Sequence, residues 1–528
     1  MTGHPTARDM LPALLADRAS AAGDDVCVVE AETGESVTFG QLALDASRMA
    51  GGLRELGVGA GDLVATMLPH SADTYRIWFA LAMLGAAEVP VGTRYRGLTL
   101  THLLEDSGVT VAVVDAAHAS VVLELLRSGD AAGLKTVVVR GGTDLEAPPG
   151  VALVSLEEVR VATRVRSHVE ATPRDLALVL YTSGTTGVAK GVLVPWGQVH
   201  ATVTGVFPEG TCRPGKVLYG PFPPNHIGGR LFVGMGINYG LPAVVRDTFS
   251  ASAYWRDVAT HGATTTALVS AMVAILSGAA PRDDDRDNSL EDVLMNPLTS
   301  DYREFEERFG LRVCTDFNMT ETSIPLHSGW EIDDWRSCGR VRPGAPGYEL
   351  ELVDEFDVPV AVGEVGELIC RTRTPWTLNA GYLGRPEESA VAWRNGWFHT
   401  GDAFRRDEQG RYYFVDRIKD AIRRRGENIS SFEVEREVLS HPEVLECAAI
   451  GVPSPIGEQD VKVFVVRSVG STLTEADLIH HVRQRAPGFM VPEHVEFVAD
   501  LPKTEATQKV MKAQLRTFPS STAAGEDR

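Results

Sequence analysis

The sequence predicts an α/β protein with a large N-terminal domain of helix-covered sheets and a small α+β C-terminal domain. Three observations lead to this fold class. The chain has 528 residues, which is too long for a single hydrophobic core. In its first half, apolar strand patterns alternate with amphipathic helix patterns, as in parallel sheets covered by helices. Near residue 416 this alternation gives way to short strands and helices of a compact unit.

The alternation is clearest over the first 140 residues. Apolar residues at helical spacing predict helices, and short apolar runs predict buried strands. The expected helices are 8–22, 43–56 and 73–84, and the expected strands are 38–42, 63–68, 87–91, 109–114 and 134–139. Residues 140–173 are rich in Gly, Pro and charge and are expected to be a connector, and the acidic run 279–288 is expected to be a solvated loop.

The C-terminal unit shows a second set of short patterns. Helices are expected at 432–440 and 475–485, and strands at 447–452 and 461–466. We therefore expect an N-terminal domain over 1–416 and a C-terminal domain over 417–528, with a disordered tail from Phe518.

Charge, cysteine content and apolar runs exclude several classes of protein. The formal net charge of −21 argues against nucleic acid as a partner, because proteins that bind it over a broad face are usually basic. No apolar run approaches the ~18 residues of a membrane helix, and the polar N-terminus shows no signal peptide. The six cysteines are scattered without a CxxC pair, which favours a reducing cytoplasm over a disulfide framework or a zinc site.

An apolar strand at 176–182 runs into a loop of small hydroxyl residues and glycines. Backbone N–H groups in such a loop bind anions, the hydroxyl groups add donors, and Lys190 adds a positive charge for a polyphosphate. The loop is not a Walker A motif, because Ala189 precedes Lys190 and residues 191–195 resemble a second strand, so a hairpin is expected. The candidate phosphate ligands are Thr182, Ser183, Gly184, Thr185, Thr186 and Lys190.

These residues resemble the signature loop of the adenylate-forming superfamily, which includes acyl-CoA synthetases, adenylation domains of peptide synthetases and luciferases. Six further motifs follow in the order of that superfamily. The resemblance implies a large N-terminal domain, a small mobile C-terminal domain, and ATP and Mg²⁺ as cofactors.

The segment 316–322 resembles the superfamily motif aromatic-Gly-x-Thr-Glu. The resemblance implies that Phe317 lies against adenine, Thr320 contacts phosphate and Glu321 holds the metal. One carboxylate suffices, since Mg²⁺ usually completes its shell with phosphate oxygens and water. Asn318 stands where the family usually has Gly, and Asn tolerates unusual backbone angles better than most residues.

The segment 396–402 resembles the motif that binds adenosine. Asp402 matches the ribose-hydroxyl acceptor, and Arg417 matches a ribose or phosphate contact. Lys419 matches the hinge about which the small domain pivots between two half-reactions.

Near the C-terminus, residues 501–510 resemble the loop that carries the lysine of adenylation. Lys509 is the candidate for this lysine, because a cation there would stabilise the charge on the α-phosphate. Gln508 stands where the family usually has Gly, and Lys503 is the alternative.

The segment 225–230 resembles the motif that opens the acyl pocket. Asn225 and His226 are expected to line this pocket, with His226 in the tunnel between the acid and the thiol. Arg230 is less usual there, and two alternatives stand: it binds a carboxylate or another small anion, or it pairs with a nearby acid.

The motifs together imply an ATP-dependent, AMP-forming ligase that joins a small-molecule acid to a thiol, with coenzyme A as co-substrate. The chain is most similar to the bacterial carnitine or crotonobetaine CoA ligase-like branch, notably over 425–430. The alternatives keep the adenylation site: loading of a carrier protein, activation of nitrite for transfer to an amine, or nucleotide binding without turnover. The acid and the oligomeric state are not readable from the sequence.

Overall fold

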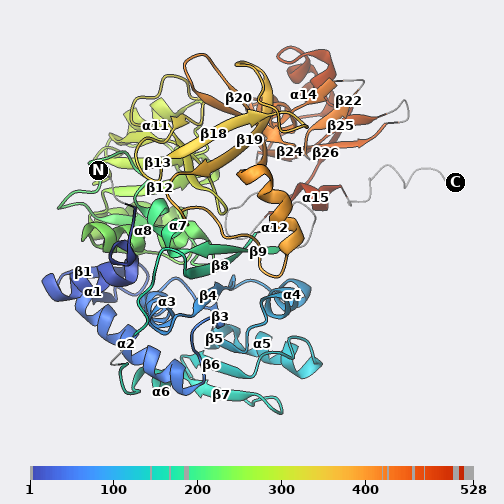
Figure 1. Cartoon of the computed structure of the whole chain (residues 1–528). Helices are drawn as coiled ribbons and strands as arrows, with labels where there is room; N and C mark the ends of the chain where they lie inside the picture. The colour runs from blue at the N-terminus through green and yellow to red at the C-terminus, as the bar shows by residue number, and fades with distance from the viewer. Residues whose placement is uncertain are drawn as a thin grey trace. The chain divides into compact units, whose positions relative to one another are not determined.

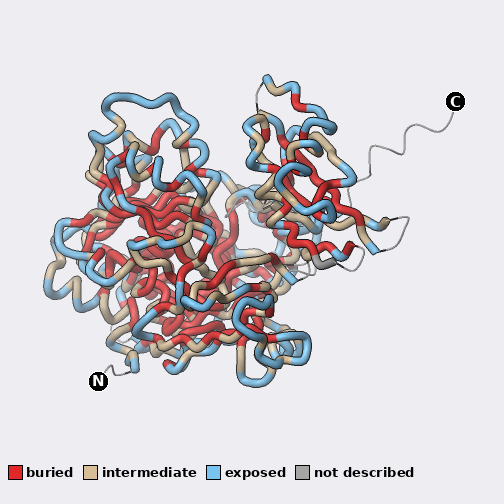
Figure 2. The backbone as a smooth tube through the Cα atoms, turned by 90° about the horizontal axis from the view of Figure 1, so that it is seen from above, coloured by how far each residue is buried: buried red, intermediate tan, exposed pale blue. Residues whose placement is uncertain are grey.

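The computed structural model describes residues 4–142, 145–165, 168–182, 189–418, 420–424, 427–454, 458–468, 470–503 and 510–516. These residues form two compact units. The large unit contains the described residues of 1–182, 189–350 and 370–398, and the small unit contains those of 351–369 and 399–528. Buried segments run through the interior of the large unit and exposed segments surround them (Figure 2).

One seven-stranded sheet of the large unit has the order β7-β6-β5-β3-β4-β8-β9 (Figure 1). Its strands are parallel except for the antiparallel pair β8 and β9. Its central strands are rich in Val and Ala and are buried, as strands covered on both faces must be. The strands are β3 (Leu63–Met67), β4 (Ala87–Pro90), β5 (Val111–Asp115), β6 (Thr136–Arg140), β7 (Ala152–Ser155), β8 (Leu176–Thr182) and β9 (Lys190–Pro195).

The second seven-stranded sheet has the order β14-β13-β12-β10-β11-β1-β2 and is parallel except for the pair β1 and β2. Its strands are β1 (Val26–Glu30), β2 (Ser36–Thr38), β10 (Leu218–Gly220), β11 (Ala243–Val245), β12 (Thr265–Val269), β13 (Asp292–Asn296) and β14 (Arg312–Cys314). A small antiparallel sheet follows, with β15 (Asp316–Met319), β16 (Ser323–His327) and β17 (Arg340–Val341).

The helices of the large unit connect these strands. A capping box starts α2, where the Thr38 hydroxyl accepts from the Gln41 backbone N–H, and α3 ends at Gly85, whose φ of 72° favours glycine. The helices are α1 (Leu11–Ala21), α2 (Phe39–Glu55), α3 (Ala72–Leu84), α4 (Gly97–Ser107), α5 (Ala116–Ser128), α6 (Leu156–Arg160), α7 (Trp196–Val203), α8 (Ile227–Tyr239), α9 (Ala251–His261), α10 (Ser270–Ser277), α11 (Tyr302–Phe309) and α12 (Pro386–Ala392).

The chain from residue 348 onward adds three further sheets, with both antiparallel and parallel strand pairs, and several short helices. A four-stranded sheet has the order β18-β19-β20-β21, a second sheet pairs β22 with β23, and a third has the order β24-β25-β26. The strands are β18 (Tyr348–Val353), β19 (Val365–Thr372), β20 (Phe398–Arg406), β21 (Tyr412–Arg417), β22 (Ile422–Arg424), β23 (Glu427–Ile429), β24 (Val444–Pro453), β25 (Gln459–Arg467) and β26 (His494–Phe497), and the helices are α13 (Ser431–Leu439), α14 (Glu475–Arg483) and α15 (Lys512–Leu515).

The α/β fold class is confirmed, and so is the hairpin of β8 and β9. The connector expected at 140–173 is wrong in part, because it contains β7, which extends the first sheet at its edge, and the helix α6. The domain boundary expected at 416 stays a prediction. Among the helices in the described ranges, none combines the length and the hydropathy needed to cross a bilayer.

Candidate active site

The strands β8 and β9 place the two ends of the predicted phosphate loop side by side. Thr182 and Lys190 face each other in the register of this pair, and both are half-buried. Ser183, Gly184, Thr185 and Thr186 lie outside the described residues. The described strands therefore hold Thr182 and Lys190 at the mouth of the loop.

Helix α4 braces this hairpin from the side. The Tyr181 hydroxyl donates to Asp106 Oδ2 at 2.8 Å, and His102 Nε2 lies 2.9 Å from the carbonyl oxygen of Ala189. The rings of His102 and Tyr181 meet edge to face. Burial, followed by the bond to Asp106, raises the pKa of Tyr181 well above its ordinary value, so its proton stays in this contact. Both ends of the hairpin are thus tied to one helix.

The Thr320–Glu321 pair lies on the turn between β15 and β16, where the Thr322 N–H donates to the Met319 carbonyl at 3.2 Å. Gln198 Nε2 donates to the Thr320 carbonyl at 2.7 Å. The backbone N–H and the side-chain amide of Asn379 each donate to the Glu321 carbonyl at 3.0 Å. The backbone of this turn is therefore held by other segments, and Glu321 is half-buried.

Tyr382 connects the predicted metal ligand with the predicted phosphate lysine. Its hydroxyl donates to Glu321 Oε1 at 3.4 Å, and Lys190 Nζ lies 5.5 Å from the centre of its ring. Burial is the main cause that raises the pKa of Tyr382, so the phenol keeps its proton. The fold thus brings Lys190 and Glu321 to one aromatic side chain, with Lys190 over its ring and Glu321 at its hydroxyl.

Asn318, which stands where the family has Gly, lies within β15 at an irregularity between Phe317 and Met319. Its Nδ2 donates to Asp316 Oδ1 at 2.8 Å. Asp316 is 3% exposed, and burial raises its pKa to about 6. A strand with a bulge thus accommodates Asn318, and Phe317 is half-buried.

The predicted pocket residues lie at the start of α8. His226 is the N-cap, and its Nδ1 accepts from the Gly228 N–H at 3.2 Å. Asn225 is half-buried beside it. Arg230 is 1% exposed: its Nη2 lies 2.6 Å from Glu88 Oε1, and its Nε donates to the Pro224 carbonyl at 2.9 Å. Of the two alternatives for Arg230, the structure shows the pair with a nearby acid, Glu88.

In the small unit, Asp402 and Arg417 are paired residues of β20 and β21. Asp402 is 4% exposed, and Arg417 Nε lies 3.6 Å from its Oδ1. The structure thus places the predicted ribose acceptor beside the predicted ribose or phosphate contact.

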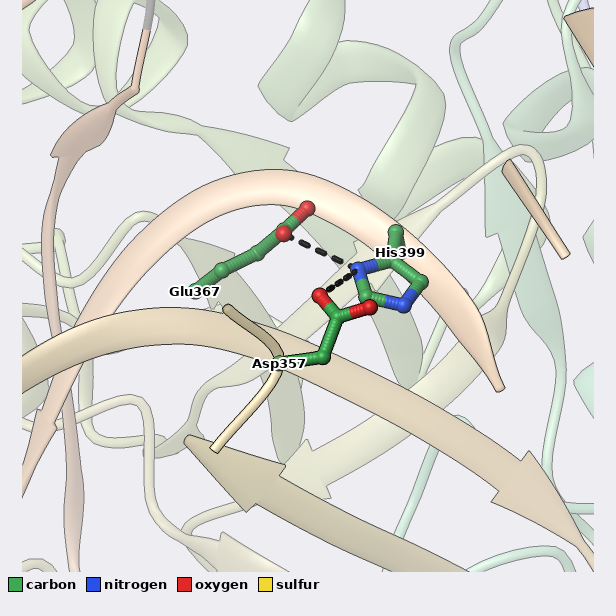
Figure 3. Close-up of side chains that lie close together, drawn as sticks. All are labelled: Asp357, Glu367 and His399. Carbon is green, nitrogen blue, oxygen red and sulfur yellow. Dashed lines mark hydrogen bonds and ion pairs between the residues drawn. The ribbon is translucent and has the colours of Figure 1, made fainter. Parts of the chain in front are cut away.

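Glu367 holds the segment that leads to Asp402. One carboxylate oxygen accepts from the Gly401 N–H at 3.0 Å, and the other lies 2.9 Å from His399 Nδ1 (Figure 3). Asp357 Oδ1 lies 3.9 Å from the same nitrogen. Glu367 and Asp357 were not predictable from the sequence, because neither is part of the 396–402 motif.

The two predicted lysines of the small unit lie outside the described residues: Lys419 and Lys509. The alternative, Lys503, is described, and its Nζ lies 2.6 Å from Glu446 and 3.1 Å from Asp500. Burial acts to lower the pKa of Lys503, but these two carboxylates outweigh it and raise the pKa. Lys503 therefore has two acidic partners within its own unit.

In the large unit, the hairpin with Lys190 and the turn with Glu321 offer the cation and the carboxylate that activation of a substrate by a nucleoside triphosphate needs. The comparisons with known proteins agree. Residues 15–383 match the family described as AMP-binding enzyme, and residues 433–507 match the AMP-binding enzyme C-terminal domain. The chain belongs to the AMP-binding enzyme family.

Curated relatives cover nearly the whole chain. The crotonobetaine/carnitine–CoA ligases of Salmonella arizonae and Salmonella paratyphi A are 31% and 30% identical to it, over 91% of this chain and 93% of each relative. Among solved structures, ATP-bound MatB from Rhodopseudomonas palustris is 25% identical with a TM-score of 0.83, and covers 96% of this chain and 98% of its own. A benzoate CoA ligase from Burkholderia xenovorans, 22% identical with the same TM-score and covering 96% of this chain and 99% of its own, has the same fold.

The chain is accordingly an ATP-dependent, AMP-forming acid–thiol ligase that acts on a small-molecule acid. It makes an acyl-adenylate and then an acyl-CoA thioester, with ATP, Mg²⁺ and coenzyme A as reactants and cofactors.

Proposed function

We propose that Lys190, Thr320 and Glu321 bind the triphosphate of ATP in the large unit. The observation that carries this proposal is the group formed by Lys190, Tyr382 and Glu321, in which a cation and a carboxylate from distant segments meet at one phenol. A cation and a metal-binding carboxylate are what a triphosphate needs for charge neutralisation. Thr182, Ser183, Gly184, Thr185 and Thr186 would supply further donors.

The side chain of Glu321 fits a magnesium ion by its chemistry. Mg²⁺ prefers carboxylate oxygens and keeps several waters, and Glu321 is half-buried with its backbone fixed by Asn379. When bound, the ion would neutralise phosphate charge. Glu321 would hold it, and Tyr382 would orient the carboxylate through its hydroxyl.

Phe317 of the large unit would contact the adenine. In the small unit, Asp402 would accept from the ribose hydroxyl groups and Arg417 would contact ribose or phosphate. Asp402 is a fixed carboxylate, as an acceptor for ribose hydroxyl groups must be. In the first half-reaction the substrate carboxylate attacks the α-phosphate of ATP and displaces pyrophosphate, and Lys509 stabilises the charge that develops on the α-phosphate.

The second half-reaction uses the same acyl-adenylate. We propose that the small domain, residues 417–528, turns about Lys419 and withdraws Lys509, and that the thiolate of coenzyme A reaches the carbonyl past His226. The thiolate forms the thioester at this carbonyl, and the bond between the acyl group and the phosphate of AMP breaks, so AMP leaves. Asn225 and His226 line the acyl pocket in this proposal, and their place at the N-terminus of α8 supports it.

Two further parts of the proposal concern partners and location. A carrier-protein thiol in place of coenzyme A is the alternative acceptor. We propose a cytoplasmic location, and the support is that the six cysteines are scattered along the sequence without a CxxC pair.

The test is pyrophosphate release from Mg·ATP against a panel of acids, each with and without coenzyme A. The panel includes crotonobetaine and carnitine, because the curated relatives are named for them, and also aromatic and dicarboxylic acids and nitrite. We expect one class of carboxylic acid to give pyrophosphate and, with coenzyme A, AMP and a thioester. Release with nitrite alone, without any need for coenzyme A, would contradict the proposal.

A further inference from the structure

The segment that follows residue 378 runs along β9 and ends at α12 (Figure 1). Backbone hydrogen bonds join the two: the Leu383 N–H donates to the Gly191 carbonyl at 2.8 Å, and the Leu193 N–H donates to the Gly381 carbonyl at 3.0 Å. The Ser389 hydroxyl accepts from the Tyr382 N–H at 2.9 Å, which ties this segment to α12. The start of α12 is therefore fixed next to Lys190, the first residue of β9.

Glu388 on α12 uses this position to form an ion pair with Lys190, between its Oε2 and the lysine Nζ. The Lys190 side chain is 17% exposed and that of Glu388 is 39% exposed. Arg385 lies on the other side of Glu388, with 4.0 Å between its Nη1 and Glu388 Oε1, and its Nη2 lies 2.9 Å from Asp106. Lys190 therefore has an anionic partner within the fold.

An ammonium group in a half-buried position is stable only with a counterion or water around it. A triphosphate is a stronger counterion than one carboxylate, because it offers several charged oxygens. When the Lys190 ammonium binds a triphosphate, its ion pair with Glu388 must break. The free energy of that ion pair therefore reduces the free energy of binding of the triphosphate. When pyrophosphate leaves, Glu388 is in place to take the ammonium back.

We propose that Glu388 is the resident counterion of Lys190 and that it lowers the affinity of the site for triphosphate and pyrophosphate, but not for AMP. This inference rests on the proposed role of Lys190 as a triphosphate ligand. Its consequence is that Glu388 favours the release of pyrophosphate and thereby the forward direction of adenylation.

The neighbouring residue Glu387 provides a matched control. It lies on the same short helix, has the same charge and is exposed. A Glu→Gln change at either position removes one negative charge with almost no change in shape. A general electrostatic effect would be the same in both variants, whereas the proposed exchange needs Glu388 alone.

The experiment measures the dissociation constants of Mg·ATP, magnesium pyrophosphate and AMP by titration calorimetry, without acid substrate. The proteins are the full-length wild type, Glu388→Gln, Glu387→Gln, Lys190→Ala and the double variant Lys190→Ala/Glu388→Gln. We expect Glu388→Gln to bind ATP and pyrophosphate about two- to fivefold more tightly than wild type, the range for a partly exposed ion pair. The AMP affinity of Glu388→Gln should equal that of wild type. Glu387→Gln should bind Mg·ATP, magnesium pyrophosphate and AMP with wild-type affinity. The double variant should bind all three as Lys190→Ala does.

Several results would overturn the inference. Unchanged or weaker ATP binding in Glu388→Gln would mean that Glu388 only aligns Lys190. An equal gain in Glu387→Gln, or a gain that persists without Lys190, would mean a general charge effect. If wild type binds Mg·ATP and Lys190→Ala binds it equally well, the proposed role of Lys190 fails together with the inference.

Discussion

Replacement of Arg230 by Met tests the conclusion that this arginine is a buried ion-pair partner. Arg230 and Glu88 are 1% and 0% exposed in their side chains, and Arg230 Nη2 lies 2.6 Å from Glu88 Oε1. Met fills a similar volume but leaves the Glu88 carboxylate in the interior without its cation. Breaking a buried pair in this way costs about 3–5 kcal/mol, so we expect Arg230→Met to lose about 4 kcal/mol of the free energy of unfolding.

Unfolding of the full-length protein in urea, followed at the large unit, measures this loss of the free energy of unfolding. The rings of Trp78 and Trp196 stack in the core, and the Arg230 guanidinium lies 5.4 Å from the Trp78 ring, so tryptophan fluorescence follows the relevant region. With a urea slope of about 3 kcal/mol per M, the midpoint falls by about 1.3 M. Arg336→Met is the control, because Arg336 is 57% exposed and pairs with Asp334 at the surface, where a pair contributes about 1 kcal/mol or less.

A double variant separates the loss of the pair from the loss of packing. Arg230→Met/Glu88→Gln removes both charges, so it should be more stable than Arg230→Met alone. A stability of Arg230→Met within about 1 kcal/mol of wild type would refute the reasoning, as would a double variant that is no more stable than the single one.

Three more predictions concern the nucleotide site and the effect of pH. Lys509→Ala should lower acid-dependent pyrophosphate release by about 10²–10³-fold, the cost of losing a group that stabilises the transition state, while calorimetry finds ATP affinity unchanged; the same loss in Lys503→Ala instead would show that the wrong lysine is assigned. Glu367→Gln keeps only one of the two acceptor oxygens that hold His399 and Gly401, so AMP should bind about 5–150-fold more weakly, the range for one lost buried acceptor. Glu364→Gln, at an exposed position, is the control, and equal AMP affinities in the two variants would contradict the role of Glu367. Burial, followed by the charge of Arg230, lowers the pKa of His70 from 6.5 to about 3, so unfolded chains take up a proton below pH 6.5 that the folded protein does not. His70 therefore costs about 2 kcal/mol of the free energy of unfolding between pH 7 and pH 5, and His70→Asn should lose that much less over this interval in urea unfolding; an equal pH dependence in both proteins would contradict the assigned shift.

Local patterns predicted most of the elements that carry the site. The strand at 176–182 and the second strand after Lys190 were predictable because both are apolar and a glycine-rich segment separates them. The strand β7 and the helix α6 were not predictable. The segment Ala152–Ser155 is short and half-exposed, and it forms a strand by pairing with β6. Edge strands of this kind depend on tertiary pairing more than on their own sequence.

The partners of the site residues were not predictable, for a related reason. Tyr382, Glu388 and Glu367 act through contacts to residues far away in the sequence, and none of the three belongs to a motif with a characteristic spacing. The pair of Arg230 with Glu88 likewise depends on the fold, which brings a residue of α8 to a residue of β4 that is 142 positions away in the sequence. The motifs in the sequence identify the candidate residues of the site, whereas the residues that position them are identified by the fold.

The most direct test of the central claim is the exchange of radiolabelled pyrophosphate into ATP in the absence of coenzyme A, with the acid that the panel identifies. If the enzyme forms an acyl-adenylate before the thiol reacts, exchange must require the acid and must not require coenzyme A. We predict this result. Exchange that occurs only when coenzyme A is present, or that proceeds equally without acid, would contradict the two-step mechanism.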